Sequence, residues 1–221
     1  MERHFEHDLE ELKQRLLRMA GLAEMAVHQA MQAVFDKDEG MAKRVLEEER
    51  AINELQLEID ERVMQMLALH APLAADLRFL LASARINNDL ERIGDQAVNI
   101  AEAAVRILRH PQVKPYVDLP RMSGLVEGMV RDSLNALVQR TPELARTVLL
   151  RDDEVDSLRN RIFHELLTYM MENPVVIFPA FELILVTKNL ERIGDHATNI
   201  AEDVIYMVAG LDVRHPGLER R

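Results

Sequence analysis

Two acidic stretches, 100 residues apart, carry the side chains in this sequence that are best suited to chemistry. The segment 90–102 recurs at 190–202, and 11 of its 13 positions are identical. At the helical rotation of about 100° per residue, each copy places its carboxylates and one asparagine nearly opposite an apolar stripe, so they face outward and not into a core. These outward residues are Glu91, Asp95, Asn99 and Glu102 in the first copy, and Glu191, Asp195, Asn199 and Glu202 in the second.

A further pair of oxygen-bearing side chains precedes each copy. Asp152 and Asp156 are four residues apart, and Glu49 and Asn53 stand 103 positions earlier. If each pair lies on a helix beside the repeated segment, four or more oxygen atoms converge on one groove. Carboxylate and amide oxygens suit hard cations, so we predict a site for Mg, Mn, Fe or Zn in each half. The predicted ligands are Glu49, Asn53, Glu91, Asp95 and Asn99, and then Asp152, Asp156, Glu191, Asp195 and Asn199.

The alternative is that these carboxylates are only solvated surface. Arg92 is three residues from Asp95, and Arg192 is three residues from Asp195, so each pair could form a weak surface ion pair. Like charges one turn apart cost a helix a few tenths of a kcal/mol, and both copies keep that arrangement. The duplication therefore favours metal binding, although two halves with shared ancestry are not independent sites.

Patterns typical of enzymes are absent from the sequence. Cysteine is missing altogether, which excludes disulfides and thiolate chemistry. There is no Gly-rich phosphate loop and no Gly-x-Ser-x-Gly elbow. A ferritin-like di-iron site would need Glu-x-x-His motifs facing the core. His28, His164 and His196 are scattered and are interpreted as surface residues. We therefore predict no catalytic residue, no organic cofactor and no enzyme.

The elements that position these residues are helices arranged as a tandem repeat. Apolar residues recur at helical spacing along nearly the whole chain, and the two halves align at offsets of 103 and then 100 residues. The fold class predicted is all-α, with two tandem antiparallel three-helix bundles related by internal duplication. The expected helices span 4–36, 40–70, 74–109, 121–140, 142–171 and 179–209, within domains 1–110 and 120–210 and followed by a tail, 211–221.

Glycines inside the expected helices indicate close packing. Gly94 and Gly194 lie mid-helix, where glycine costs about 1 kcal/mol relative to alanine. We expect another helix to approach closely at both positions, with Gly21 and Gly124 on the facing helices. Gly210 is expected to end the last helix.

Charge and hydropathy narrow the range of partners. The net charge of −11 and the absence of tryptophan disfavour nucleic acid. The most apolar run, 175–186, contains Pro179 and Glu182 and is shorter than the roughly 20 residues that a bilayer requires. The sequence begins without the apolar stretch of a signal peptide, so the expected compartment is the cytoplasm.

The Leu-Glu-Arg-Ile-Gly-Asp motif, found at 90–95 and again at 190–195, resembles the PhoU family. Asp76-Leu77-Arg78, which leads into the third helix, agrees with the same family. The resemblance implies a non-enzymatic negative regulator of the phosphate-starvation response and of phosphate uptake. It implies an adaptor between the ATPase of the phosphate ABC importer and a sensor histidine kinase, peripheral to the membrane through proteins only, and a homodimer. It also implies multinuclear metal clusters on the outer face, where Asn53 departs from the family's carboxylate. A metal-binding or metal-storage bundle is the alternative function.

Overall fold

The computed structural model describes residues 2–113 and 118–214, and within these ranges the chain is helical and contains no strand. The predicted all-α class and the tandem duplication are confirmed. Gly210 ends the last helix in the left-handed conformation, with a φ of 69°. The predicted tail extends beyond residue 214, outside the described residues. The helices are α1 (Glu2–Asp36), α2 (Glu39–His70), α3 (Ala74–Ile107), α4 (Asp118–Gln139), α5 (Pro142–Leu149), α6 (Asp152–Glu172), the 3₁₀ turn η1 (Pro174–Val176) and α7 (Ile177–Ala209).

The fifth expected helix, 142–171, is wrong in one respect, because the chain breaks it into α5 and α6 at residues 150–151. The Arg151 amide donates to the Val148 carbonyl, three residues back, which interrupts the α-helical ladder. The Arg151 side chain then binds Asp132 of α4 at 2.7 Å. Three consecutive carboxylates begin α6 and lie where the helix dipole favours negative charge. The first half has Glu-Arg-Ala at the equivalent positions 49–51, and there α2 runs without a break.

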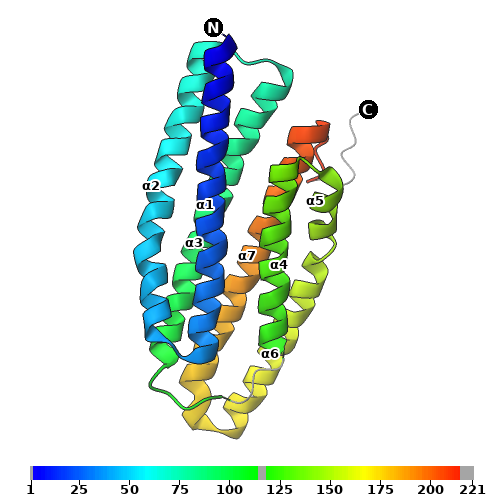
Figure 1. Cartoon of the computed structure of the whole chain (residues 1–221). Helices are drawn as coiled ribbons and strands as arrows, with labels where there is room; N and C mark the ends of the chain where they lie inside the picture. The colour runs from blue at the N-terminus through cyan, green and yellow to red at the C-terminus, as the bar shows by residue number, and fades with distance from the viewer. Residues whose placement is uncertain (1, 114–117, 215–221) are drawn as a thin grey trace.

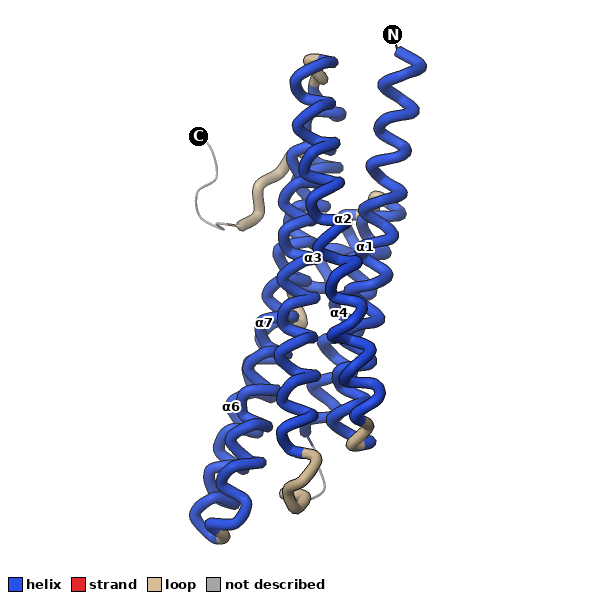
Figure 2. The backbone as a smooth tube through the Cα atoms, turned by 90° about the vertical axis from the view of Figure 1, so that its left-hand side faces the viewer, coloured by secondary structure: helices blue, strands red, loops and turns tan. Residues whose placement is uncertain are grey.

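The two halves lie side by side, with α3 and α7 packed together along the middle of the molecule and α4 beside α1 (Figures 1 and 2). The predicted inward stripe of α3 is buried and forms the centre of the core. Its members are at most 3% exposed: Ile86, Leu90, Ile93, Ala97, Ile100, Ala104 and Ile107. This apolar burial supplies the main stabilisation of the fold.

Charged pairs join α3 to α7 across the boundary between the halves. Arg85 binds Asp203 at 3.1 Å, and Arg106 binds Glu182 at 2.9 Å. Both carboxylate residues are buried, so each depends on its arginine for charge compensation. Because the residue number rises along α3 as it falls along α7, the two helices run antiparallel.

The mid-helix glycines mark close helix contacts, as predicted. A Cβ on Gly94 would lie 3.1 Å from Cδ1 of Ile52 on α2, and a Cβ on Gly194 would lie 3.6 Å from Cγ1 of Val155 on α6. The expectation for Gly21 and Gly124 is wrong. Both are exposed, and a Cβ on either would have no atom of another helix within 4 Å.

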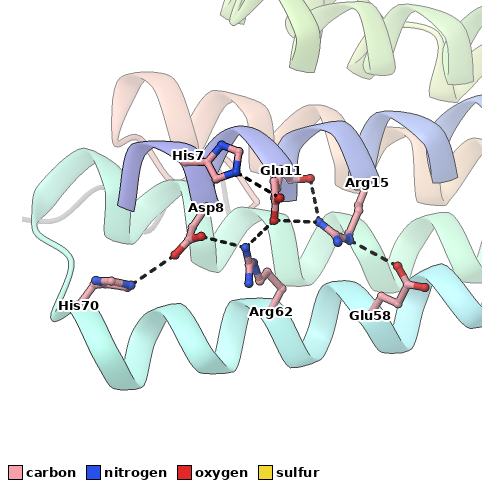
Figure 3. A network of polar contacts seen from close by, with 7 residues as sticks. All are labelled: His7, Asp8, Glu11, Arg15, Glu58, Arg62 and His70. Carbon is pink, nitrogen blue, oxygen red and sulfur yellow. Dashed lines mark hydrogen bonds and ion pairs between the residues drawn. The ribbon is translucent and has the colours of Figure 1, made fainter. Parts of the chain in front are cut away.

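A polar network ties the start of α1 to the end of α2 (Figure 3). Arg62 of α2 donates to Asp8 at 2.8 Å and to Glu11 at 2.5 Å, and both acceptors lie on α1. His70 approaches the other oxygen of Asp8 at 3.5 Å. The network holds these two helices in register near the N-terminus of α1 (Figures 1 and 3).

Candidate metal-binding grooves

The predicted acidic residues lie along two equivalent grooves, one between α2 and α3 and the other between α6 and α7. In both halves the middle and last helices pack against each other, as the prediction required. The repeated motif puts Ile93 and Ile193 into the core, and helical rotation then turns the carboxylates of the same segments away from it. The apolar stripes therefore determine where the acidic groups point.

In the first groove, Glu91 of α3 is close to the acidic residues of both helices. Partial burial raises the pKa of Glu91, and the negative charges of Asp95 and Glu49 add to this effect. The Oε2 atom of Glu91 and the Oδ1 atom of Asn53 are both buried, and neither has a hydrogen-bond partner among the described residues. The Glu91 oxygen has an ion-pair contact with Arg92 Nε at 3.5 Å, but not the geometry of a hydrogen bond. Buried acceptors in folded proteins are normally hydrogen-bonded, so two oxygens without hydrogen bonds in this groove fit a cation that would bind them.

In the second groove the negative charges are more crowded. Partial burial raises the pKa of Asp195 to about 6, and the charges of Glu191, Asp152 and Asp156 contribute in the same direction. Burial also raises the pKa of Asp152, followed by the charges of Asp156, Asp153 and Glu191. The structure thus brings together all four carboxylates predicted for this half, two on α6 and two on α7.

In neither groove do the predicted ligands converge on a single coordination centre. Within residues 2–113 and 118–214, no group of three or more Asp, Glu or His side chains is placed to hold one ion together. Arginines occupy part of the space, since Arg92 approaches Glu91 at 3.5 Å and Asp95 at 3.4 Å, while Arg159 approaches Glu191 at 3.6 Å. Metal binding therefore requires the arginine side chains to rotate away and the carboxylates to turn toward one point, and the metal set stays a prediction.

Two of the three asparagines in the predicted set, Asn99 and Asn199, lie apart from these carboxylates. Asn199 donates to Asp89 of α3 at 3.1 Å, on the boundary between the halves, whereas Asn99 is exposed. The expectation that His196 is a surface residue is wrong. Its side chain is 20% exposed, and its Nδ1 lies 2.8 Å from the same oxygen of Asp89. Sequence reasoning missed Asp89. The available signal was a difference between the halves, because the second half has the neutral Asn189 at the position equivalent to Asp89.

A family model described as the PhoU domain matches this chain twice, at residues 16–104 and 119–204. Together the two matches cover most of the chain and fall one on each half of the structure.

The chain belongs to the PhoU family.

Curated PhoU relatives match it over nearly its full length. The phosphate-specific transport system accessory protein PhoU homolog of Pseudomonas putida is 41% identical over 217 residues, which cover 98% of this chain and 85% of the relative. The homolog of Aquifex aeolicus is 38% identical, and the match covers 97% of this chain and 97% of the relative.

Solved PhoU structures have the same fold. The crystal structure of PhoU from Pseudomonas aeruginosa matches with a TM-score of 0.91 at 38% identity, over 94% of this chain and 100% of that one. The phosphate transport system regulatory protein PhoU from Streptococcus pneumoniae matches with a TM-score of 0.86 at 28% identity, over 96% and 100%.

Proposed function

We propose that this PhoU family member is a negative regulator of the phosphate-starvation response and of phosphate uptake. It acts as an adaptor between the ATPase of the phosphate ABC importer and the sensor histidine kinase of that response. The observation that carries the proposal is similarity over nearly the full length to proteins named accessory to phosphate-specific transport. An adaptor needs surfaces on a rigid body and no reaction centre, and two fused helical bundles with acidic grooves supply such a body.

The proposed place of action is the cytoplasmic face of the membrane, reached through protein contacts. No helix in the described residues is both long and apolar enough to cross a bilayer. The net charge of −11 favours basic protein surfaces over anionic lipid or nucleic acid. A homodimer is proposed from the family resemblance, and it is consistent with exposed apolar side chains on the helix surfaces.

Alkaline phosphatase activity, a readout of the phosphate-starvation response, tests the regulatory role. The host gene is deleted, and the enzyme is assayed in phosphate-rich medium with and without a plasmid copy of the chain. We expect high activity in the deletion strain and low activity after complementation. Continued low activity in the deletion strain would contradict the proposal for this host.

We propose separately that the two acidic grooves hold Mg, Mn, Fe or Zn ions. Glu49, Asn53, Glu91 and Asp95 would supply the oxygens in the first groove, with one carboxylate fewer than the second. The unsatisfied buried oxygens of Asn53 and Glu91 support this proposal in the first half. The crowded carboxylates around Asp195, whose pKa is raised to about 6, support it in the second, because a cation would relieve their repulsion.

Metal storage is the alternative function that these grooves favour. The two functions predict different effects of mutation on cellular metal content and on alkaline phosphatase repression. In a storage protein, alanine at Glu91, Asp95, Glu191 and Asp195 would lower cellular metal content and leave alkaline phosphatase repression intact. In the adaptor, deletion of the chain releases repression whatever the metal content. Metal analysis of the purified protein, paired with the phosphatase assay, separates the two.

A further inference from the structure

The hairpin formed by α6 and α7 exposes aromatic side chains in a chain that has few. The sequence contains six phenylalanines. Three of them are exposed, at 40%, 43% and 52% of their surface, and all three lie on this hairpin: Phe163, Phe178 and Phe181. Exposed phenylalanine contributes nothing to the core, and clustered exposed apolar residues mark interaction sites.

Two of these phenylalanines, Phe163 and Phe181, continue the acidic groove of the second half toward the tip of the hairpin. The third, Phe178, packs its ring on His110, with the ring centroids 4.5 Å apart. A pocket in the groove is lined by residues of both helices: Arg159, Phe163, Ile184, Thr187, Lys188 and Glu191. Helical spacing extends each wall from this pocket in both directions. Along α6 the wall runs Asp152, Asp156, Arg159, Phe163 and Leu167, and along α7 it runs Asp195, Glu191, Lys188, Ile184, Phe181 and Ile177.

The groove therefore changes character along its length. One end carries four carboxylates, the middle carries one cation on each wall, and the far end is apolar. Among the described residues Lys188 makes no ion pair. The buried Nε atom of Arg159 lies 3.6 Å from Glu191 Oε1, an ion pair without a hydrogen bond. From Ile177 to Asp195 is 18 residues, or about 27 Å of helix.

The equivalent groove of the first half lacks these aromatic and cationic residues, so the duplicated fold does not itself require them. The positions equivalent to Phe163 and Phe181 hold Asp60 and Leu81, and those equivalent to Arg159 and Lys188 hold Gln56 and Asn88. Asp60 accepts a hydrogen bond from Asn87 at 2.9 Å, so it serves a contact within its own half. The aromatic residues and the cations are thus specific to the α6–α7 groove.

We infer that the α6–α7 groove is the docking site for an amphipathic helix of a partner protein, about five turns long, with an apolar face and a lysine- or arginine-bearing end. The apolar face packs on Phe163, Leu167 and Phe181. In the metal-free groove the basic end lies against the carboxylates around Asp195. A helix lying in a groove between two helices is a common mode of recognition, and buried aromatic residues dominate the binding energy of such contacts.

This inference rests on the proposed function, because the partner is sought in the phosphate importer. Membrane vesicles that contain the overproduced importer, and vesicles from cells that lack it, are mixed with the purified full-length chain in EDTA. Bound protein is measured by sedimentation. The test variant is Phe163→Ser combined with Phe181→Ser. Two single variants serve as controls: Leu81→Ser, at the matched position of the first half, and Leu150→Ser, at an apolar residue that is 82% exposed outside the groove.

We expect the wild type and both controls to bind the importer vesicles, and the double variant to bind at least about tenfold more weakly. Thermal unfolding of every variant confirms that exposed-site substitutions leave the fold intact. Binding of the double variant at the wild-type level, or equal losses in the controls, would overturn the groove assignment and leave the regulatory function standing. Failure of the wild type to bind importer vesicles better than empty ones would overturn the adaptor role and, with it, this inference.

A charge-reversal arm tests the basic end of the partner. Asp152→Lys combined with Asp156→Lys reverses the charge on the α6 wall. Glu47→Lys combined with Glu61→Lys, at exposed residues of α2, is the control with the same change in net charge and should bind as the wild type does. We expect the α6 variant to lose affinity for importer vesicles at least about tenfold, and the loss to shrink as salt is raised. Equal or tighter binding by the α6 variant would show that the partner presents no basic end to this groove.

Discussion

Replacing the two mid-helix glycines with alanine should change stability in opposite directions. Gly94 and Gly194 are equivalent residues in the two copies of one motif, so they have the same intrinsic cost, about 1 kcal/mol each relative to alanine. Any difference between the two variants must therefore come from what the added methyl group meets. The duplication makes each position the control for the other.

At Gly194 the methyl group has room. Its nearest neighbours would be Val155 Cγ1 at 3.6 Å and Met129 Cε at 3.9 Å, which are ordinary van der Waals distances. The gain in helix propensity is kept, and the new contacts add a little attraction. We expect Gly194→Ala to raise the free energy of unfolding by about 1 kcal/mol.

At Gly94 the methyl group would crowd a buried side chain. It would lie 3.1 Å from Cδ1 and 3.4 Å from Cγ2 of Ile52, which is 1% exposed. Cδ1 can move by rotation about χ2, but Cγ2 moves only if χ1 rotates or the helix shifts, and a β-branched residue in a helix has one strongly preferred χ1 rotamer. Overpacking of this kind costs about 1–3 kcal/mol, which cancels or exceeds the gain in propensity. We expect Gly94→Ala to lower the free energy of unfolding by about 1 kcal/mol.

Urea unfolding followed by circular dichroism measures both variants, with the slope of free energy against urea checked for constancy. The expected outcome is a gap of about 2 kcal/mol between the two variants. Stabilisation of equal size at both positions would refute the reasoning, because it would show that α2 does not restrict space at Gly94. A lower free energy of unfolding for Gly194→Ala would also refute the reasoning, because it would show that the added methyl group has no room there.

Three further predictions concern charged groups. The pKa of Asp195 is raised from 3.8 to about 6, so the folded state binds a proton more tightly than the unfolded state does. The free energy of unfolding should therefore rise as the pH falls from 7 to 5. In urea titrations, Asp195→Asn should flatten that dependence. At pH 7, Mn²⁺ should raise the melting temperature of the wild type, and should do so less for Asp195→Asn, as differential scanning fluorimetry would show. His196→Ala should cost about 1–2 kcal/mol in urea unfolding, because the buried Asp89 would lose one of its two hydrogen bonds to α7.

Sequence periodicity was sufficient for the fold and for the placement of the acidic grooves. An apolar stripe at helical spacing must be buried, and Ile93 and Ile193 are buried in equivalent places. Once those residues face the core, the carboxylates of the same turns are directed away from it. The glycines of the motif were interpreted correctly for the same reason, because a cost kept in both copies needs a packing contact to offset it.

Contacts between the halves could not be derived in this way. The pairing of Asp89 with His196 joins residues 107 positions apart, and it depends on how α3 lies against α7. Gly21 and Gly124 are equivalent residues of the two halves, as Gly94 and Gly194 are, yet both face solvent. Helical spacing gives the direction of a side chain around its own helix, but it does not say which neighbour occupies that direction.

The sequence by itself determined the helices, their duplication, the buried stripes and the outward position of the carboxylates, because these follow from local periodicity and from the free energy of burying apolar surface. Only the tertiary structure decided that Asp152, Asp156, Glu191 and Asp195 crowd one another. It alone showed that the same groove continues into exposed phenylalanines on the second hairpin. These properties depend on which helices become neighbours, and that choice is made by the packing of the whole chain.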